Sequence, residues 1–168
     1  MNYTIIYSSR KTVALSVKDG EVIVRAPRGF SKKRIATFVE GHKDWIEKKL
    51  ASQKAMIDKM DSLTPADISR MKKEAKAYFT ARAEQYAAFM GLKYSNLKIT
   101  SAKRRFGSCN SNGVICFSYR LMLYPEAARD YVVVHELAHL VHMNHSPAFY
   151  ALIARYMPDY KERKHLLK

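Results

Sequence analysis

The chain has 168 residues, of which 48% are hydrophobic, which suits one globular domain or one domain with a small appendage and excludes a disordered chain. The 30 Lys and Arg residues against 15 Asp and Glu give a formal net charge of +15, which favours a nucleic acid or another anionic partner, although a solvated basic surface explains it equally well. Two cysteines exclude a disulfide framework, and no stretch suits a signal peptide or a membrane span, so we expect a cytoplasmic protein without membrane contact.

The first 28 residues predict β-strands. Apolar and polar residues alternate on both sides of Asp19-Gly20, which is the strongest short signal for a two-residue hairpin turn. The pairs expected across this turn are Val17 with Val22 and Leu15 with Val24.

An amphipathic helix is expected next. Ser31 can cap it, and apolar residues recur at three- and four-residue spacing as far as Leu50. His42 lies on the apolar stripe without a metal-spaced partner, so we interpret it as structural. Residues 51–63 either continue the helix or form a linker. Residues 1–63 are therefore expected to form an N-terminal subdomain of a β-hairpin and a helix.

Residues 64–168 are expected to form the second unit. Thr64-Pro65 opens a helix that stops at Gly91, and a short strand follows at 97–100. Asn112-Gly113 then predicts a second two-residue hairpin turn.

The second hairpin contains both cysteines. With Asn112-Gly113 as its turn, Cys109 lies directly opposite Cys116. The pair can be two small core residues, a redox pair or part of a metal site. The structural interpretation is favoured because the sequence has no CxxC motif.

The segment 125–144 predicts a third helix. In its central turns, 131–141, the only polar side chains apart from tyrosine are His135, Glu136 and His139. A helix that is apolar nearly all round is buried, and burying two imidazoles and a carboxylate is costly unless they are paired or bind a metal. Histidines at i and i+4 reach one zinc ion from one face, and the adjacent glutamate holds the water. The sequence therefore predicts an HExxH site with Zn²⁺ as its cofactor.

Two further histidines follow the HExxH motif. His142 lies on the same helical face as His135 but about 10 Å further along the axis, too far to share one ion while the helix stays straight. Asn144 tolerates a left-handed conformation and can end the helix, and a reversal there returns His145 toward the metal. We expect His145 to be the third ligand and His142 to lie outside the ligand set, behind a ligand or in the cleft wall.

The spacing HExxHxxxxxH matches that of metzincins, although His142 stands where they have glycine. The wider sequence resembles the YgjP-like zinc metallopeptidases more closely, with Phe106 in place of the tryptophan of their RWGSC motif. The zinc segment is also similar to the SprT-like and WLM-type proteases, which act on DNA-bound proteins. The segments that carry the resemblance are DGEVIVRAP, FVEGHKDWIEKKL, RRFGSCNSNGVICFSYRLMLYP, DYVVVHELAHLVHMNHSPAFY and MPDYKERKHLL.

The resemblance implies an α+β fold. A compact zincin-like core with an active-site helix and a short antiparallel sheet would follow an N-terminal β-hairpin and helix. The implied catalytic base is Glu136, and the implied zinc ligands are His135, His139 and His145. An edge strand at about 113–118 is also implied, where substrate backbone would add as an extra strand. Its substrate-binding residues would be Val114, Ile115 and Cys116.

The leading hypothesis is a zinc-dependent metallopeptidase that cleaves a peptide or protein substrate. Glu136 would take a proton from zinc-activated water and pass it to the leaving amine. Another side chain should stabilise the oxyanion. The candidates for this role are Arg105, Tyr119, Tyr150 and Tyr156.

Two alternative functions stay open. A zinc-dependent nucleotide phosphohydrolase suits the basic surface, but the sequence has no glycine-rich phosphate loop and no carboxylate cluster for magnesium. A nucleic-acid-associated protease acting on DNA-bound proteins is favoured by the net charge. The last 58 residues hold only 7 basic against 5 acidic residues, so we expect any basic binding face to lie away from the histidine-rich segment.

Overall fold

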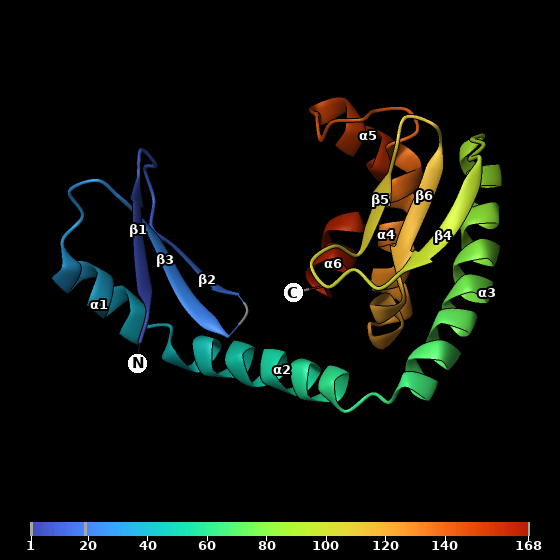
Figure 1. Cartoon of the computed structure of the whole chain (residues 1–168). Helices are drawn as coiled ribbons and strands as arrows, with labels where there is room; N and C mark the ends of the chain where they lie inside the picture. Colours follow the sequence, from blue (N-terminus) through green and yellow to red (C-terminus); the bar gives the residue numbers. More distant parts are fainter. Residues whose placement is uncertain (1, 19, 168) are drawn as a thin grey trace. The chain divides into compact units, whose positions relative to one another are not determined.

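The computed structural model describes residues 2–18 and 20–167, and the chain divides into two compact units, Met1–Leu63 and Thr64–Lys168. Each unit combines helices with one three-stranded sheet, which confirms the expected α+β class (Figure 1). Among the described residues, no helix has both the length and the apolar character needed to cross a membrane.

The sheet of the first unit has the order β1 (Thr4–Ser8), β3 (Glu21–Pro27), β2 (Ala14–Lys18). Its antiparallel pair contains the two expected contacts, Val17 with Val22 and Leu15 with Val24, so the predicted register is confirmed. Asp19 of the predicted turn lies outside the described residues. Gly20 has a φ of 79°, a left-handed conformation that glycine adopts without strain. β1 runs parallel to β3 and completes the sheet.

The single helix expected from residue 31 to about Leu50 is wrong, because the chain forms two helices there. They are α1 (Lys32–Glu40) and α2 (Lys43–Asp61). Most of residues 51–63, for which a helix and a linker were both open, is therefore helix. The break falls at Gly41 and His42, where His42 becomes the exposed N-cap of α2 and its Nδ1 lies 2.7 Å from the Phe38 carbonyl oxygen. His42 is therefore structural through this local contact rather than through the core.

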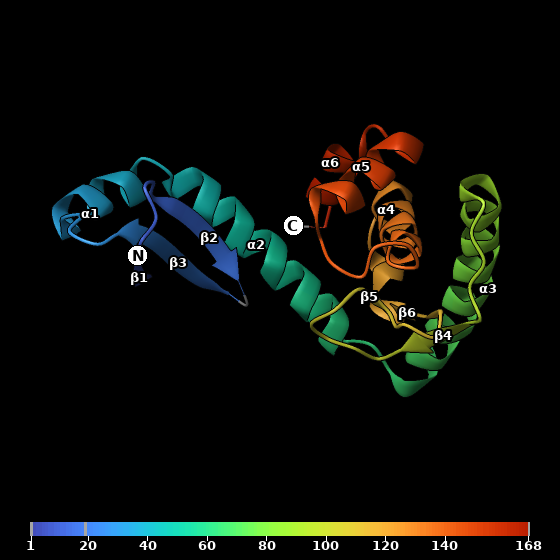
Figure 2. The ribbon, with the colours of Figure 1, turned by 90° about the horizontal axis from the view of Figure 1, so that it is seen from above.

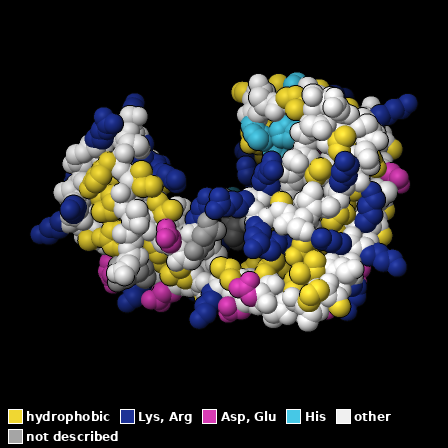
Figure 3. Space-filling view, viewed as in Figure 1, with side chains coloured by type: hydrophobic (Ala, Val, Ile, Leu, Met, Phe, Trp, Pro, Cys, Tyr) yellow, Lys and Arg dark blue, Asp and Glu magenta, His cyan; other side chains and the backbone are white. Residues whose placement is uncertain are grey.

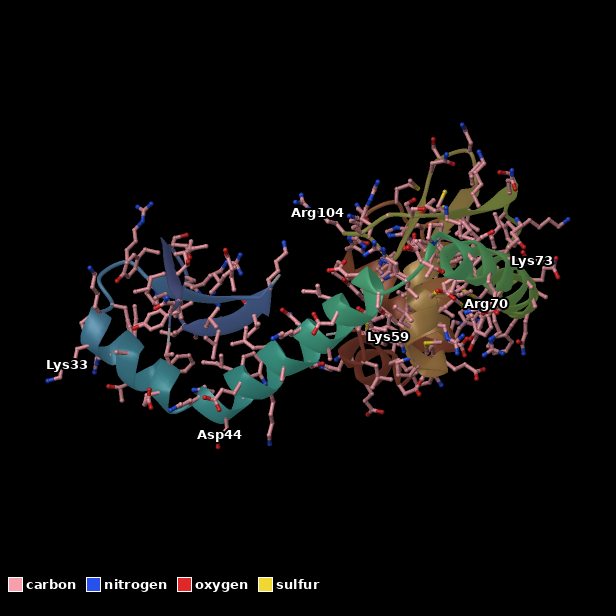
Figure 4. The ribbon with its side chains drawn as sticks, turned by 60° about the horizontal axis from the view of Figure 1, so that its bottom comes forward. Lys33, Asp44, Lys59, Arg70, Lys73 and Arg104 are labelled. Atoms are coloured by element: carbon pink, nitrogen blue, oxygen red, sulfur yellow. The ribbon has the colours of Figure 1, made fainter. Side chains whose placement is uncertain are left out.

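The apolar core of the first unit lies between β3 and the two helices. Lys33 on α1 and Asp44 on α2 point away from it into solvent (Figure 4). The buried members of this core are Val22, Val24, Ala26, Ile35, Val39 and Ile46.

The second unit begins with α3 (Pro65–Met90). Thr64 and Asp67 form a reciprocal capping box at its start, and Gly91 ends it with a φ of 68°, as the sequence predicts. The remaining elements are β4 (Asn96–Thr100), β5 (Gly107–Cys109), β6 (Val114–Ser118), the 3-10 helix η1 (Tyr119–Leu123), α4 (Glu126–Ala138), α5 (Pro147–Tyr156) and α6 (Tyr160–His165).

α3 and α4 cover the same face of the second sheet. Phe79 of α3 stacks on Phe117 of β6 with ring centroids 4.7 Å apart, and α4 packs against β5 beside it. Figure 2 shows α4 lying between the sheet and the pair formed by α5 and α6. Most side chains of α4 are buried, which confirms the prediction that this helix lies inside the core.

The expected edge strand at 113–118 is wrong, because β6 is the central strand of its sheet. The order is β4-β6-β5, with β6 parallel to β4 and antiparallel to β5, so the sheet is mixed rather than antiparallel. Both sides of Val114, Ile115 and Cys116 are already paired, and no substrate strand can add there. Among the described residues, β5 pairs with β6 alone, so its other side is free.

The second hairpin turns through three residues rather than two. Asn110 accepts hydrogen bonds through its side-chain oxygen from two N–H groups of the loop, and Gly113 takes a φ of 72°. The resulting pairs are Cys109 with Ile115 and Ser108 with Cys116, so the expected pairing of the two cysteines is wrong. A one-residue change of register moves paired side chains to opposite faces, which separates the cysteines.

Candidate metal centre

α4 places the first residues of the HExxH motif and then ends. His135 and Glu136 lie in its last turn, and His139 is its C-cap. The expected helix to residue 144 is therefore too long, and the reversal expected at Asn144 begins earlier. The Nδ1–H of His139 donates to the carbonyl oxygen of His142 at 3.0 Å, a carbonyl that a continuing helix would point away from His139.

The early reversal brings His145 back to the helix. His145 Nε2 lies 3.1 Å from His135 Nε2, and one nitrogen from each of His135, His139 and His145 lies within 4.8 Å of the others. Nitrogen ligands of one tetrahedral zinc lie about 3.4 Å apart at ordinary bond lengths. The structure thus brings together the three histidines that the sequence singles out, at spacings that fit one metal ion.

Contacts behind two of the imidazoles fix their orientation. The Nδ1–H of His139 donates to the His142 carbonyl. The Nδ1 of His135 lies 3.3 Å from the hydroxyl of Tyr131, which is one turn earlier on α4. Each contact leaves Nε2 to face the centre, which is how metal-binding histidines are usually held. His142 contributes its carbonyl, and its imidazole is outside the three-histidine group. Tyr131 was missed from the sequence, although its i−4 spacing from His135 was a signal.

Phe149 forms the apolar floor beneath the three imidazoles. Its ring centroid lies 4.5 Å from that of His139, 4.9 Å from that of His135 and 5.0 Å from that of His145. The side chain is fully buried near the start of α5, whose N-cap is Ser146, as the Ser-Pro pair predicts. Apolar packing on one side leaves the histidines open on the other.

Burial favours the neutral form of two of the three imidazoles, those of His135 and His139. Desolvation lowers the pKa of His135 to about 3, and the nearby His139, His145 and Lys164 add to the shift. Desolvation also lowers the pKa of His139, although the His142 carbonyl opposes it. The neutral imidazole is the form that binds a metal ion.

Glu136 is held in a tight, buried position beside the histidines. Its side chain is 5% exposed, and desolvation raises its pKa to about 8 against the opposing charge of Arg105. β5 approaches so closely that a Cβ atom on Gly107 would lie 2.6 Å from Oε1 of Glu136. The absence of a side chain at Gly107 therefore makes room for the carboxylate.

A cavity of about 260 Å³ opens over these residues. Its walls are Gly107, Ser108 and Cys109 of β5, the carboxylate and histidines of the motif, and Met143. Figure 3 shows histidine side chains grouped at the surface of the second unit, with Lys and Arg side chains beside them. The arrangement is a solvent-accessible site with a carboxylate and three imidazoles on one side and a strand edge on the other.

One of the two cysteines, Cys109, lies at this site. Cys109 lines the cavity, but desolvation raises the pKa of its thiol to about 11, helped by the charges of Glu136 and Cys116. Both cysteines are free. Cys109 is not part of the three-histidine group, so it is a wall residue of the cavity.

Two of the four expected oxyanion donors lie near the site. The ring of Tyr150 stacks on that of His145 with centroids 6.2 Å apart, and the charge of Arg105 acts on Glu136. Tyr119 is buried beneath Lys72 and Arg120 instead. Tyr156 packs its ring against Phe89, with centroids 5.3 Å apart.

Asp130 of α4 forms a buried polar cluster with residues of α3 and α6, and it was not predicted from the sequence. This α4 residue is 3% exposed and forms a salt bridge with Arg82, whose Nε donates to Oδ1 at 2.8 Å. Hydroxyls of Tyr78 and Tyr86 donate to the same carboxylate at 3.3 and 3.2 Å, and Arg163 of α6 lies 3.7 Å from it. The signal was an acidic residue on a helix expected to be buried, one position before the apolar stretch 131–141.

Comparison with known proteins identifies the family of this chain. The sequence profile of the YgjP-like metallopeptidase domain matches residues 11–68 and 66–168. The crystal structure of the metallopeptidase zymogen of Pyrococcus abyssi abylysin is similar, with 21% identity and a TM-score of 0.49 over 53% of this chain and 90% of that one. That of Methanocaldococcus jannaschii jannalysin has 17% identity and a TM-score of 0.47 over 53% and 92%. No curated protein matches the sequence. Because the profile spans most of its length, the chain belongs to the YgjP-like metallopeptidase family.

Proposed function

We propose that this metallopeptidase is zinc-dependent, with His135, His139 and His145 as the metal ligands and Glu136 as the general base. The observation that carries the proposal is the convergence of three imidazoles beside a buried carboxylate in an open cavity. Three nitrogen ligands with one open position are typical of catalytic zinc. A zinc ion held there would polarise the scissile carbonyl and acidify the attacking water.

Glu136 suits the role of a proton carrier. Burial raises its pKa to about 8, close to the operating range of a general base, and a nearby dication favours its carboxylate form. In that form Glu136 would accept the proton of the attacking water and later pass it to the leaving amine. Tyr150 or Arg105 would donate to the oxyanion that forms when the water attacks, before the amine leaves, since both lie next to residues of the site.

The substrate backbone would lie along β5. One side of this strand is free among the described residues, and its three residues line the same cavity as Glu136 and the histidines. A peptide added to this edge would gain backbone hydrogen bonds and carry its scissile carbonyl past the histidines. β5 would thus take the substrate-binding role that the family resemblance implied for β6.

Peptide bonds are a better-supported target than phosphate esters. The family is a metallopeptidase family, and the described part of the chain offers no carboxylate cluster or phosphate loop beside the histidines. A DNA-bound substrate is supported only by the net charge and by the resemblance of the zinc segment to the SprT-like and WLM-type proteases, so we do not propose it.

The direct test is a cleavage screen with a library of internally quenched peptides. We expect cleavage by the zinc-loaded protein, loss of cleavage after chelation and recovery when zinc is returned. A rate of hydrolysis that does not change after chelation would contradict the proposal.

A further inference from the structure

A second pocket lies between α5 and α6 in the same unit. Its volume is about 320 Å³, and its lining residues are Tyr150, Tyr160, Lys161, Lys164 and His165. The four from α6 follow the spacing i, i+1, i+4 and i+5, which places them on one side of that helix. The pocket is therefore a built concavity with two tyrosines and two lysines, and it is distinct from the histidine cavity.

Tyr150 connects this pocket to the metal centre. On the side of the metal centre, the ring of Tyr150 stacks on that of His145 with centroids 6.2 Å apart. On the pocket side, the Lys164 Nζ lies 5.4 Å from the Tyr150 ring centroid, and Tyr160 stacks on Tyr150 at 6.1 Å. Three to four extended peptide residues, at about 3.5 Å each, would cover the distance from His145 to Tyr150 together with that from Tyr150 to the pocket residues. A substrate held at the histidines can therefore reach the pocket.

The residues that line the pocket give it a positive charge. None of the described residues lining it is acidic. The Asp159 carboxylate near the start of α6 accepts a 2.8 Å hydrogen bond from Arg163, which also approaches Asp130 inside the unit. Arg163 thus forms ion pairs with acidic residues on the inner side of α6, while Lys161 and Lys164 line the pocket. The charge balance of the last 58 residues did not predict a basic feature so close to the histidines.

We propose that this pocket is a carboxylate-binding subsite that selects peptides with an anionic group three to four residues from the scissile bond. An ammonium group is a compact charge with three donors, and tyrosine hydroxyls add neutral donors, so the set suits a carboxylate. The carboxylate can be the free C-terminus of the peptide or an acidic side chain. The inference rests on the proposed peptidase function, because it assigns the charge preference of that same active site.

The test compares matched peptides with one cleavage sequence. One pair differs in a C-terminal acid or amide, and a second pair carries Glu or Gln three or four residues from the cleaved bond. We expect the anionic member of at least one pair to have a kcat/KM about tenfold higher, since charge-assisted hydrogen bonds exceed neutral ones by about this factor. The pair that shows the difference identifies the source of the carboxylate.

The variants locate the preference in the pocket. The double substitution Lys161→Ala with Lys164→Ala should bring the ratio of anionic to neutral kcat/KM close to one. Lys164→Glu should shift the ratio in favour of peptides with Lys at that position, a gain that misfolding cannot produce. Lys73→Ala is the matched control, because Lys73 is an exposed lysine on α3 (Figure 4), and it should keep the wild-type ratio.

A binding measurement separates this inference from the proposed function. Calorimetry with Glu136→Gln should show tighter binding of the anionic peptide, and the lysine double variant should lose that difference. Equal binding and equal cleavage within both pairs would overturn the subsite while leaving the peptidase function intact. A preference that survives the double substitution would also overturn it. Absence of any cleavage would contradict the peptidase function, and the binding comparison would still decide the subsite.

Discussion

Gly107 of β5 and Glu136 of α4 approach so closely that a Cβ atom on the glycine would lie 2.6 Å from the carboxylate oxygen. Backbone conformation does not require glycine here, because Gly107 is not among the positive-φ residues. The requirement is spatial, because the strand edge and the Glu136 carboxylate occupy neighbouring sides of one cavity. This contact fixes the position of the carboxylate relative to the histidines.

Gly107→Ala should impair catalysis more than metal binding. The added methyl group would displace the Glu136 carboxylate, and a shift of about 1 Å in a catalytic group costs about a hundredfold in rate. Steady-state cleavage of a quenched peptide and zinc content measured on the same sample would check this. Gly41→Ala is the control, because its nearest contact would be an ordinary 3.5 Å. Full activity in Gly107→Ala would show that the close approach has no catalytic role.

His145→Ala should lose zinc far more readily than His142→Ala. His145 places its imidazole within the three-histidine group, whereas His142 supplies only its backbone carbonyl to His139, which alanine retains. Zinc content after dialysis against a weak chelator would measure the difference. The reverse order of zinc loss would overturn the ligand assignment.

Tyr131→Phe should weaken zinc binding without removing it. The hydroxyl lies 3.3 Å from Nδ1 of His135, and loss of such a supporting contact typically costs about 10- to 100-fold in metal affinity. Competition with a fluorescent zinc chelator gives the affinity. Tyr156→Phe removes a hydroxyl from a tyrosine packed on Phe89, away from the histidines, and should bind zinc like the wild type. Equal affinities in the two variants would rule out the supporting role.

Asp130→Ala should destabilise the fold. It leaves Arg82 and two tyrosine hydroxyls without their buried acceptor, and breaking such a buried pair costs about 3–5 kcal/mol. Asp159→Ala removes a more exposed partner of Arg163 and should cost about 0–1 kcal/mol. Urea unfolding of both variants at a fixed zinc concentration would give the two free energies. Similar small losses would mean that the carboxylate does not anchor α4.

Local sequence patterns predicted the elements that depend on near neighbours. The register of Val17 with Val22 follows from alternation around a two-residue turn. At the second hairpin the same reasoning failed, because the Asn110 side chain bonds two loop N–H groups and stabilises a turn one residue longer. That error placed Cys109 opposite Cys116.

The histidine group could be predicted from the sequence because its members lie within eleven residues of each other. Their convergence depends on helix geometry and one reversal, both of which leave local signals. The roles of Gly107 and of the partners of Asp130 could not be predicted, because they depend on contacts between elements far apart in the chain. The central place of β6 likewise depends on β4 pairing across a long separation in sequence.

The most direct test of the proposed chemistry is the zinc content and peptide hydrolysis of Glu136→Gln, measured on one preparation beside the wild type. Glutamine preserves the size of the side chain and removes its ability to carry the proton, so we expect one zinc per chain and a loss of turnover of at least about a hundredfold. Undiminished hydrolysis by zinc-loaded Glu136→Gln would contradict the central claim.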